Sequence, residues 1–218
     1  MIGQKLKDLG FGTGLYKNPA YYAVKVPVFS FEKLTDVNSS LSPEMKSTGE
    51  VLGLGKTLDE ALFKGLTAAG FQMRHPEAGR DVGILISVNK RERMEIVPLA
   101  RKFHDLGFKL YATDGTAAAI MELGIHVEVV DKLCRDDRVL ELMENGTIGY
   151  IILTGSTEPE YIRDFIHLNR RALQLSIPCL TSLDTANVLA DTLASRYTPF
   201  NTELVDINNL RTHQQVLT

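Results

Sequence analysis

The stretch Val82-Gly-Ile-Leu-Ile-Ser-Val88 decides the fold of this chain. It is a short apolar run, which is typical of a strand buried on both faces of a parallel sheet. Four more such runs follow, and we predict strands at 109–112, 127–130, 149–153 and 177–180. Helical patterns alternate with them, at 91–106, 115–123, 136–145, 158–175 and 183–195. Five strand–helix units predict an α/β fold: a five-stranded parallel sheet with helices on both faces, in a Rossmann-type three-layer arrangement.

The sequence before this region has a different character. Residues 1–50 are rich in Gly, Pro and aromatic residues, and 24–29 alternate like a strand in which Pro27 requires an edge or a bulge. Thr57-Leu-Asp-Glu60 is a capping box that predicts a helix at 57–69, with Glu60 reaching back to the helix start, and 74–81 reads as a polar linker. We divide the chain into 1–55, 56–80 and 81–218, and 204–207 could form one more short strand.

Composition limits the class of protein. The chain has 218 residues, 44% of them hydrophobic, which is enough for one sizeable core or one core with a small appendage. The net charge of −3 argues against nucleic-acid binding, and no apolar run reaches the roughly 18 residues of a membrane span. Cys134 and Cys179 lack a CxxC spacing and fit a reducing cytoplasm, where we expect both to be buried filler.

Ligands of an open parallel sheet bind beyond the carboxyl ends of its strands, so the loops there hold the candidate site. The residues that follow the first strand are Ser87, Lys90 and Arg93, with Asn89 and Arg91 between them. The loops after the second, third and fourth strands add Thr113, Asp114, Gly115, Thr116, Lys132, Thr154, Gly155 and Ser156.

Thr113-Asp-Gly-Thr116 is the most informative of these loops. A strand ends, a glycine permits an unusual turn, and a helix begins within four residues. The free N–H groups and the positive dipole end of that helix would point at the ligand, and the threonine hydroxyls suit phosphate oxygens. The alternative is that Thr and Asp serve only as helix caps.

The basic cluster Lys90, Arg91 and Arg93 bears on this alternative. Positive charge at a helix start opposes the dipole, so it costs stability unless an anion is present. Glu92 and Glu95 could offset that charge, and a solvated surface is the alternative interpretation. Together with Lys132 on a neighbouring loop, the cluster favours an anion site at this edge.

Other catalytic arrangements are poorly supported by the sequence. The five histidines have no metal-ligand spacing, and neither a G-x-S-x-G elbow nor a P-loop is present. Asp136, Asp137 and Asp184 are most simply helix caps. We therefore expect no catalytic residue and no metal site.

Two further stretches carry a resemblance to a known family. Pro27-Val-Phe-Ser-Phe-Glu-Lys33 and Pro43-Glu-Met-Lys-Ser-Thr-Gly-Glu-Val51 closely resemble the end of the second ATP-grasp unit of carbamoyl-phosphate synthase large subunits. The helix at 57–69 and the region from 82 to about 210 resemble the methylglyoxal-synthase-like (MGS-like) regulatory domain that follows it. The resemblance implies that 1–55 are a remnant of ATP-grasp, 56–80 a connecting helix and linker, and 81–218 an allosteric domain.

This family makes carbamoyl phosphate from bicarbonate, glutamine-derived ammonia and ATP, for pyrimidine and arginine biosynthesis, and its regulatory domain binds nucleotides such as UMP or IMP. The resemblance places nucleotide- or phosphate-contacting roles on Ser87, Thr113, Thr116 and Lys132. Arg93 stands where a lysine is usual, Leu153 where an asparagine is usual, and Gly155 replaces a hydroxyl residue. Val26 and Cys179 replace polar residues linked with ornithine binding, which argues against ornithine activation.

The resemblance also implies partners: a nucleoside monophosphate effector, the remainder of the large subunit and the glutaminase small subunit. The fragment needs no cofactor, whereas the full subunit uses ATP with Mg or Mn. We expect a cytoplasmic protein that binds neither nucleic acid nor membrane, could form a homo-oligomer, and is inactive as an isolated chain. The alternatives are a methylglyoxal synthase-like lyase, although its His-Asp pair is missing at Val88-Asn89-Lys90, and an oligomerisation module.

Overall fold

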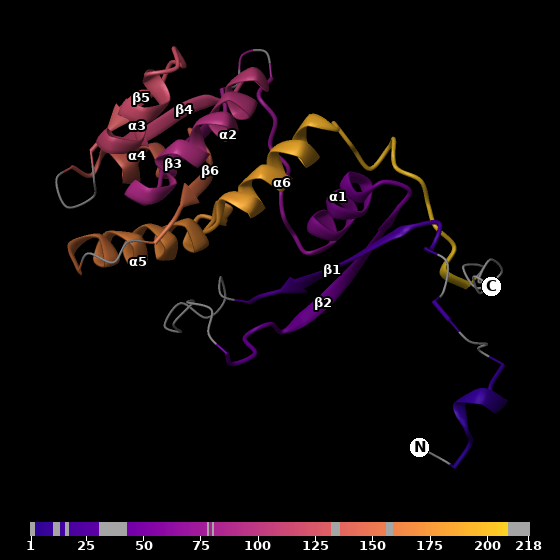
Figure 1. Cartoon of the computed structure of the whole chain (residues 1–218). Coiled ribbons are helices and arrows are strands. Elements are labelled where there is room, and N and C mark those ends of the chain that lie inside the picture. Colours follow the sequence, from indigo (N-terminus) through magenta and orange to yellow (C-terminus); the bar gives the residue numbers. More distant parts are fainter. Residues whose placement is uncertain are drawn as a thin grey trace.

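The computed structural model describes residues 3–10, 14–15, 18–30, 43–77, 79, 81–131, 136–155 and 159–208. Figure 1 shows a larger α/β part and a smaller part made of a two-stranded hairpin with one helix. We call the larger part the sheet unit and the smaller part the hairpin unit. A short 3-10 helix, Leu6–Asp8, lies near the N-terminus. Among the described residues, no helix combines the length and the apolar character needed to cross a bilayer.

The sheet unit contains five parallel strands in the order β5-β4-β3-β6-β7. The chain steps outward from the central strand β3 to β4 and β5, then returns to the other side of β3 with β6 and β7. The strand order therefore reverses between β3 and β6, which is the switch point where ligands bind in this class of sheet. The strands are β3 Gly83–Ser87, β4 Lys109–Thr113, β5 Glu128–Val130, β6 Ile148–Leu153 and β7 Cys179–Leu180.

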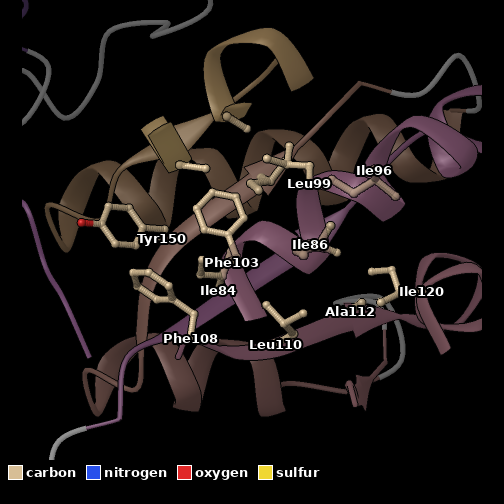
Figure 2. Close-up of a cluster of buried hydrophobic side chains, with 14 of the residues drawn as sticks. Ile84, Ile86, Ile96, Leu99, Phe103, Phe108, Leu110, Ala112, Ile120 and Tyr150 are labelled. Atoms are coloured by element: carbon tan, nitrogen blue, oxygen red, sulfur yellow. The ribbon is translucent and has the colours of Figure 1, made fainter. Parts of the chain in front are cut away.

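Helices cover both faces of this sheet, as the sequence predicts. Ile84 and Ile86 point to the face covered by α2, α3 and α6, whereas Leu85 points to the face covered by α4 and α5. Figure 2 shows the first of these cores, where the ring of Phe108 lies 5.8 Å from those of Phe103 and Tyr150. The helices are α2 Arg93–Asp105, α3 Asp114–Met121, α4 Arg138–Glu144, α5 Pro159–Gln174 and α6 Leu183–Ala194, and a short 3-10 helix, η2 Lys90–Glu92, precedes α2.

The hairpin unit consists of β1 Tyr22–Val28, β2 Gly49–Gly55 and α1 Leu58–Ala68. Within the described residues β1 pairs only with β2, so Pro27 lies in an edge strand as expected. The helix packs on the strands almost backbone to backbone: a Cβ added at Gly53 would lie 2.6 Å from Gly65 N and closer still to Ala61 O. Glycine is therefore required on β2 because any side chain would displace α1.

Two sequence predictions were wrong or incomplete. The tail residues Leu204–Asp206 form no strand, and a 3-10 turn follows at 207. The strand β2 was not predicted, because glycines at 49, 53 and 55 remove the apolar alternation that indicates a strand. The division of the chain at residues 55 and 80 stays a prediction.

Candidate anion site at the carboxyl edge of the sheet

Two hydroxyl groups meet where the adjacent strands β3 and β4 end. The register pairs Ile86 of β3 with Ala112 of β4, so the next residue on each strand, Ser87 and Thr113, lies at the same edge. Their hydroxyl oxygens are 3.2 Å apart, within hydrogen-bonding distance. On its other side Ser87 is in register with Leu153 of β6. The edge at the switch point is therefore lined by polar groups from β3 and β4.

The start of α3 has no side-chain cap. Thr113 occupies the N-cap position, with φ −69° and ψ 150°, but its side chain makes no hydrogen bond to the helix backbone. The capping alternative therefore fails for Thr113, whose hydroxyl is within hydrogen-bonding distance of Ser87 instead. Asp114 is exposed in the first turn, where a carboxylate complements the helix dipole.

The side chain of Arg93 lies over this helix start. A Cβ built on Gly115 would be 2.5 Å from Cζ of Arg93, with Nη2 nearer still, so the guanidinium rests on the bare backbone of the first turn of α3. The Nε atom of Arg93 is buried and finds no hydrogen-bond acceptor among the described residues. A guanidinium beside the positive end of a helix, with an unsatisfied N–H, is an arrangement that an anion would stabilise.

Comparisons with known proteins agree with this fold. Residues 95–181 match the family model described as the MGS-like domain. The chain is 42% identical, over 192 residues, to a carbamoyl phosphate synthase large chain of Clostridium botulinum (strain Langeland / NCTC 10281 / Type F), an alignment that covers 88% of this chain and 18% of that protein. This chain is a relative of carbamoyl phosphate synthase large chains and contains an MGS-like domain.

A second relative gives the same result. The carbamoyl phosphate synthase large chain of Clostridium botulinum (strain Loch Maree / Type A3) is 39% identical over 210 residues, covering 96% of this chain and 19% of that protein. The chain thus spans about a fifth of the length of these relatives. The crystal structure of ForH aligns at 18% identity, over 53% of this chain and 79% of the ForH chain, with a TM-score of 0.38.

Two buried threonines of the MGS-like domain hold the β3–η2 loop in place. Thr116 is 1% exposed as a residue, and its hydroxyl accepts a hydrogen bond from the backbone N–H of Val88 at 3.3 Å. The Thr154 hydroxyl accepts one from the N–H of Asn89 at 2.8 Å. Their hydroxyl oxygens therefore support the loop that leads to Arg93, and each hydroxyl can still donate its own proton.

Asn89 was placed in the loop after the first strand by the sequence but was not predicted to be a site residue. Its side-chain amide donates to the carbonyl of Gly155 at 3.2 Å, and its Oδ1 accepts from the N–H of Arg91 at 3.2 Å. Asn89 thereby joins the loops that follow β3 and β6, while also capping η2. Two signals were available: its place beyond the carboxyl end of the first strand, and its position as an N-cap residue directly before a helical turn.

The predicted site residues can now be placed. Hydrogen bonds and close approaches bring together Ser87, Arg93, Thr113, Gly115, Thr116, Thr154 and Gly155. Lys90 is exposed on η2, and Lys132 and Ser156 lie outside the described residues. The family match begins at residue 95 and therefore includes the start of α3. The β3–η2 loop lies before residue 95, so only the alignments with the longer relatives extend over it. A role in ligand contact stays a prediction for each of these residues.

The described residues offer little for other chemistry. Where the chain is described, no group of three His, Cys, Asp or Glu side chains gathers as a metal site would require. Burial raises the pKa of the Cys179 thiol to about 12, so Cys179 is a protonated thiol at neutral pH and a poor nucleophile. Cys134 lies outside the described residues.

Proposed function

We propose that this chain is the effector-binding region of a carbamoyl phosphate synthase large subunit, and that the carboxyl edge of its sheet binds the phosphate of a nucleoside monophosphate of the UMP or IMP type. The observation that carries the proposal is the guanidinium of Arg93 on the start of α3, where the described residues provide neither a side-chain cap for the helix nor an acceptor for Nε. A phosphate accepts from both groups at once, and charge-assisted hydrogen bonds of this kind are strong.

The residues take distinct roles in this proposal. Arg93 and the backbone N–H groups at the start of α3 donate to the phosphate, and the hydroxyls of Ser87 and Thr113 complete its coordination. Thr116, Thr154 and Asn89 hold the loop in position. Lys90, Lys132 and Ser156 remain candidates from the sequence for additional contacts with the nucleotide.

The whole-protein activity belongs to the longer relatives. Because this chain spans about a fifth of their length, we propose that it acts together with the remainder of the large subunit and the glutaminase small subunit, in the cytoplasm, and makes no carbamoyl phosphate alone. ATP-dependent formation of carbamoyl phosphate by the purified chain would contradict this part of the proposal.

Calorimetric titration tests the site. UMP and IMP are titrated separately into the wild-type chain, Arg93→Ala and Arg101→Ala. Arg101 is a matched control because it lies on the same helix and donates to the carbonyl of Leu123, away from the edge. We expect millimolar or tighter binding by the wild type, a loss of about tenfold or more in Arg93→Ala, and little change in the control.

Two results would contradict the proposal. The first is a flat titration of the wild-type chain with both nucleotides. The second is equal loss of affinity in Arg93→Ala and Arg101→Ala, which would indicate a non-specific charge effect. Methylglyoxal formation from dihydroxyacetone phosphate would instead favour the lyase alternative, and nucleotide-independent association in light scattering would favour the assembly alternative.

A further inference from the structure

The chain returns to the hairpin unit after α6. Residues 196–206, which we call the tail, leave the end of α6 and run beside α1, as Figure 1 shows in yellow. The hydroxyls of Tyr197 and Thr57 are 3.0 Å apart, and the rings of Tyr197 and Phe63 are 6.3 Å apart. The last segment of the sheet unit therefore touches the first turn of the hairpin unit's helix.

Glu60 is the centre of this contact. Its side chain is almost fully buried, at 5% residue exposure. One oxygen accepts from the backbone N–H of Lys56 at 2.9 Å, and the other accepts from the backbone N–H of Glu203 at 2.9 Å and from Lys64 Nζ at 2.8 Å. A single carboxylate thus satisfies donors from α1, from the turn before α1, and from the tail, 143 residues away.

Lys64, like Glu60, binds several groups from different segments through one charged group. Besides its ion pair with Glu60, its ammonium donates to the carbonyl of Leu54 at 2.7 Å and to the carbonyl of Glu203 at 2.5 Å. Both the N–H and the C=O of Glu203 are therefore bound to one partly buried ion pair. The side chain of Glu203 adds an exposed salt bridge to Lys56 at 2.7 Å.

Apolar burial contributes little to holding the tail. Phe200 and Leu204 are each 98% exposed, whereas Tyr197 is half-buried and its ring packs against the buried ring of Phe63. The attachment combines this one ring contact with polar contacts around one carboxylate, in contrast to the apolar cores on both faces of the sheet. Contacts between units that are polar and small open more readily than an apolar core unfolds.

We propose that Glu60, Lys64 and the tail form a latch that holds the hairpin unit against the sheet unit, and that opening it loosens the hairpin unit while the sheet unit stays folded. The latch is a conformational device separate from the proposed nucleotide site, and it does not depend on nucleotide binding. A two-stranded hairpin with one helix is marginal by itself, so its order depends on this attachment together with the direct contact between α1 and α6.

Hydrogen exchange of the full chain, read by mass spectrometry, tests the latch with two substitutions at one position. Glu203→Pro removes the N–H that Glu60 accepts, and 203–206 have no regular structure that proline could interrupt. Glu203→Ala keeps that N–H and removes only the exposed pair with Lys56. We expect exchange in α1 to rise about tenfold in Glu203→Pro and by less than about twofold in Glu203→Ala, with the sheet unit unchanged.

A second pair of variants acts on the acceptor. Glu60→Gln replaces one accepting oxygen by an NH₂ group that faces donors, whereas Glu50→Gln makes the same change at an exposed residue of the same unit that pairs with Lys25. The latch predicts faster exchange in α1 and the tail for Glu60→Gln alone. Equal exchange in Glu203→Pro and Glu203→Ala, or loosening of the sheet unit along with α1, would overturn it.

Discussion

The sheet unit and the hairpin unit are each stabilised by a different kind of interaction. Central strand β3 is buried on both faces, with Ile84 and Ile86 on one side and Leu85 on the other. The hairpin unit has one helix packed on glycines and one partly buried ion pair. The first unit can form its core from its own residues, whereas the second depends on close backbone approach and on the returning tail. Two substitutions and a change of pH separate these two modes of stabilisation, and a third substitution tests the anion site of the sheet unit.

The largest effect is expected in the core of the sheet unit. Ile86→Ala removes a fully buried side chain between β3 and the helices on one face, and it should lower the free energy of unfolding by about 4 kcal/mol. Urea denaturation of the purified variant measures this loss. Leu52→Ala, at a half-exposed position on β2, is the control and should change stability by less than about 1 kcal/mol. Similar losses in both would contradict the contrast between the two units.

The next effect lies in the hairpin unit and should stay local. In Gly53→Ala the new methyl group meets the backbone of α1 at Ala61 and Gly65, so the helix must shift, at a cost of about 3 kcal/mol. Hydrogen exchange should show loss of protection in α1 while β3 and β6 keep theirs. Gly49→Ala, where a Cβ meets nothing within 4 Å, is the matched control. If β3 and β6 lose protection as well, the two units are one cooperative body.

Acid should weaken the hairpin unit through Glu60. The hydrogen bond from Lys64, with those from the backbone of Glu203 and Lys56, lowers the pKa of Glu60 from 4.5 to about 2. The folded form therefore favours the charged carboxylate, and its stabilisation is present above pH 4.5 and is lost as the pH falls toward 2. At pH 3 the free energy of unfolding should be about 2 kcal/mol lower than at neutral pH. Exchange rates in α1, corrected for intrinsic pH dependence, measure it. Glu60→Gln should lack this pH dependence, and a wild-type profile in that variant would assign the effect to another group.

The smallest effect concerns the anion site. Gly115→Ala places a methyl group where the guanidinium of Arg93 lies, and the flexible arginine can move aside at little cost to the fold. We expect affinity for the nucleotide to fall about tenfold with unfolding stability nearly unchanged. Calorimetry and urea denaturation of the same preparation separate these quantities. Gly49→Ala should change neither the affinity nor the stability. Unaltered affinity in Gly115→Ala would show that Arg93 does not contribute to nucleotide binding.

Local sequence pattern determined most of the sheet unit. The apolar runs and helical spacing placed five strands and five helices within a few residues of their observed bounds, because buried strands and amphipathic helices have distinct periods. The rule that ligands bind beyond the carboxyl ends of parallel strands also selected Ser87, Thr113 and Thr154, which the fold brings to one edge. The residue types along the chain were sufficient for both results.

Only the tertiary structure decided which groups meet. The partner of the Thr113 hydroxyl is Ser87, 26 residues away, and the partner of Glu60 includes an N–H 143 residues away, so no local period could indicate either. The strand β2 and the path of the tail were likewise set by contacts with α1 rather than by apolar alternation. The sequence determines local structure where the spacing of apolar residues lets a strand or helix bury one face. Tertiary contacts decide the structure where a polar group or a glycine must meet the backbone of a distant segment.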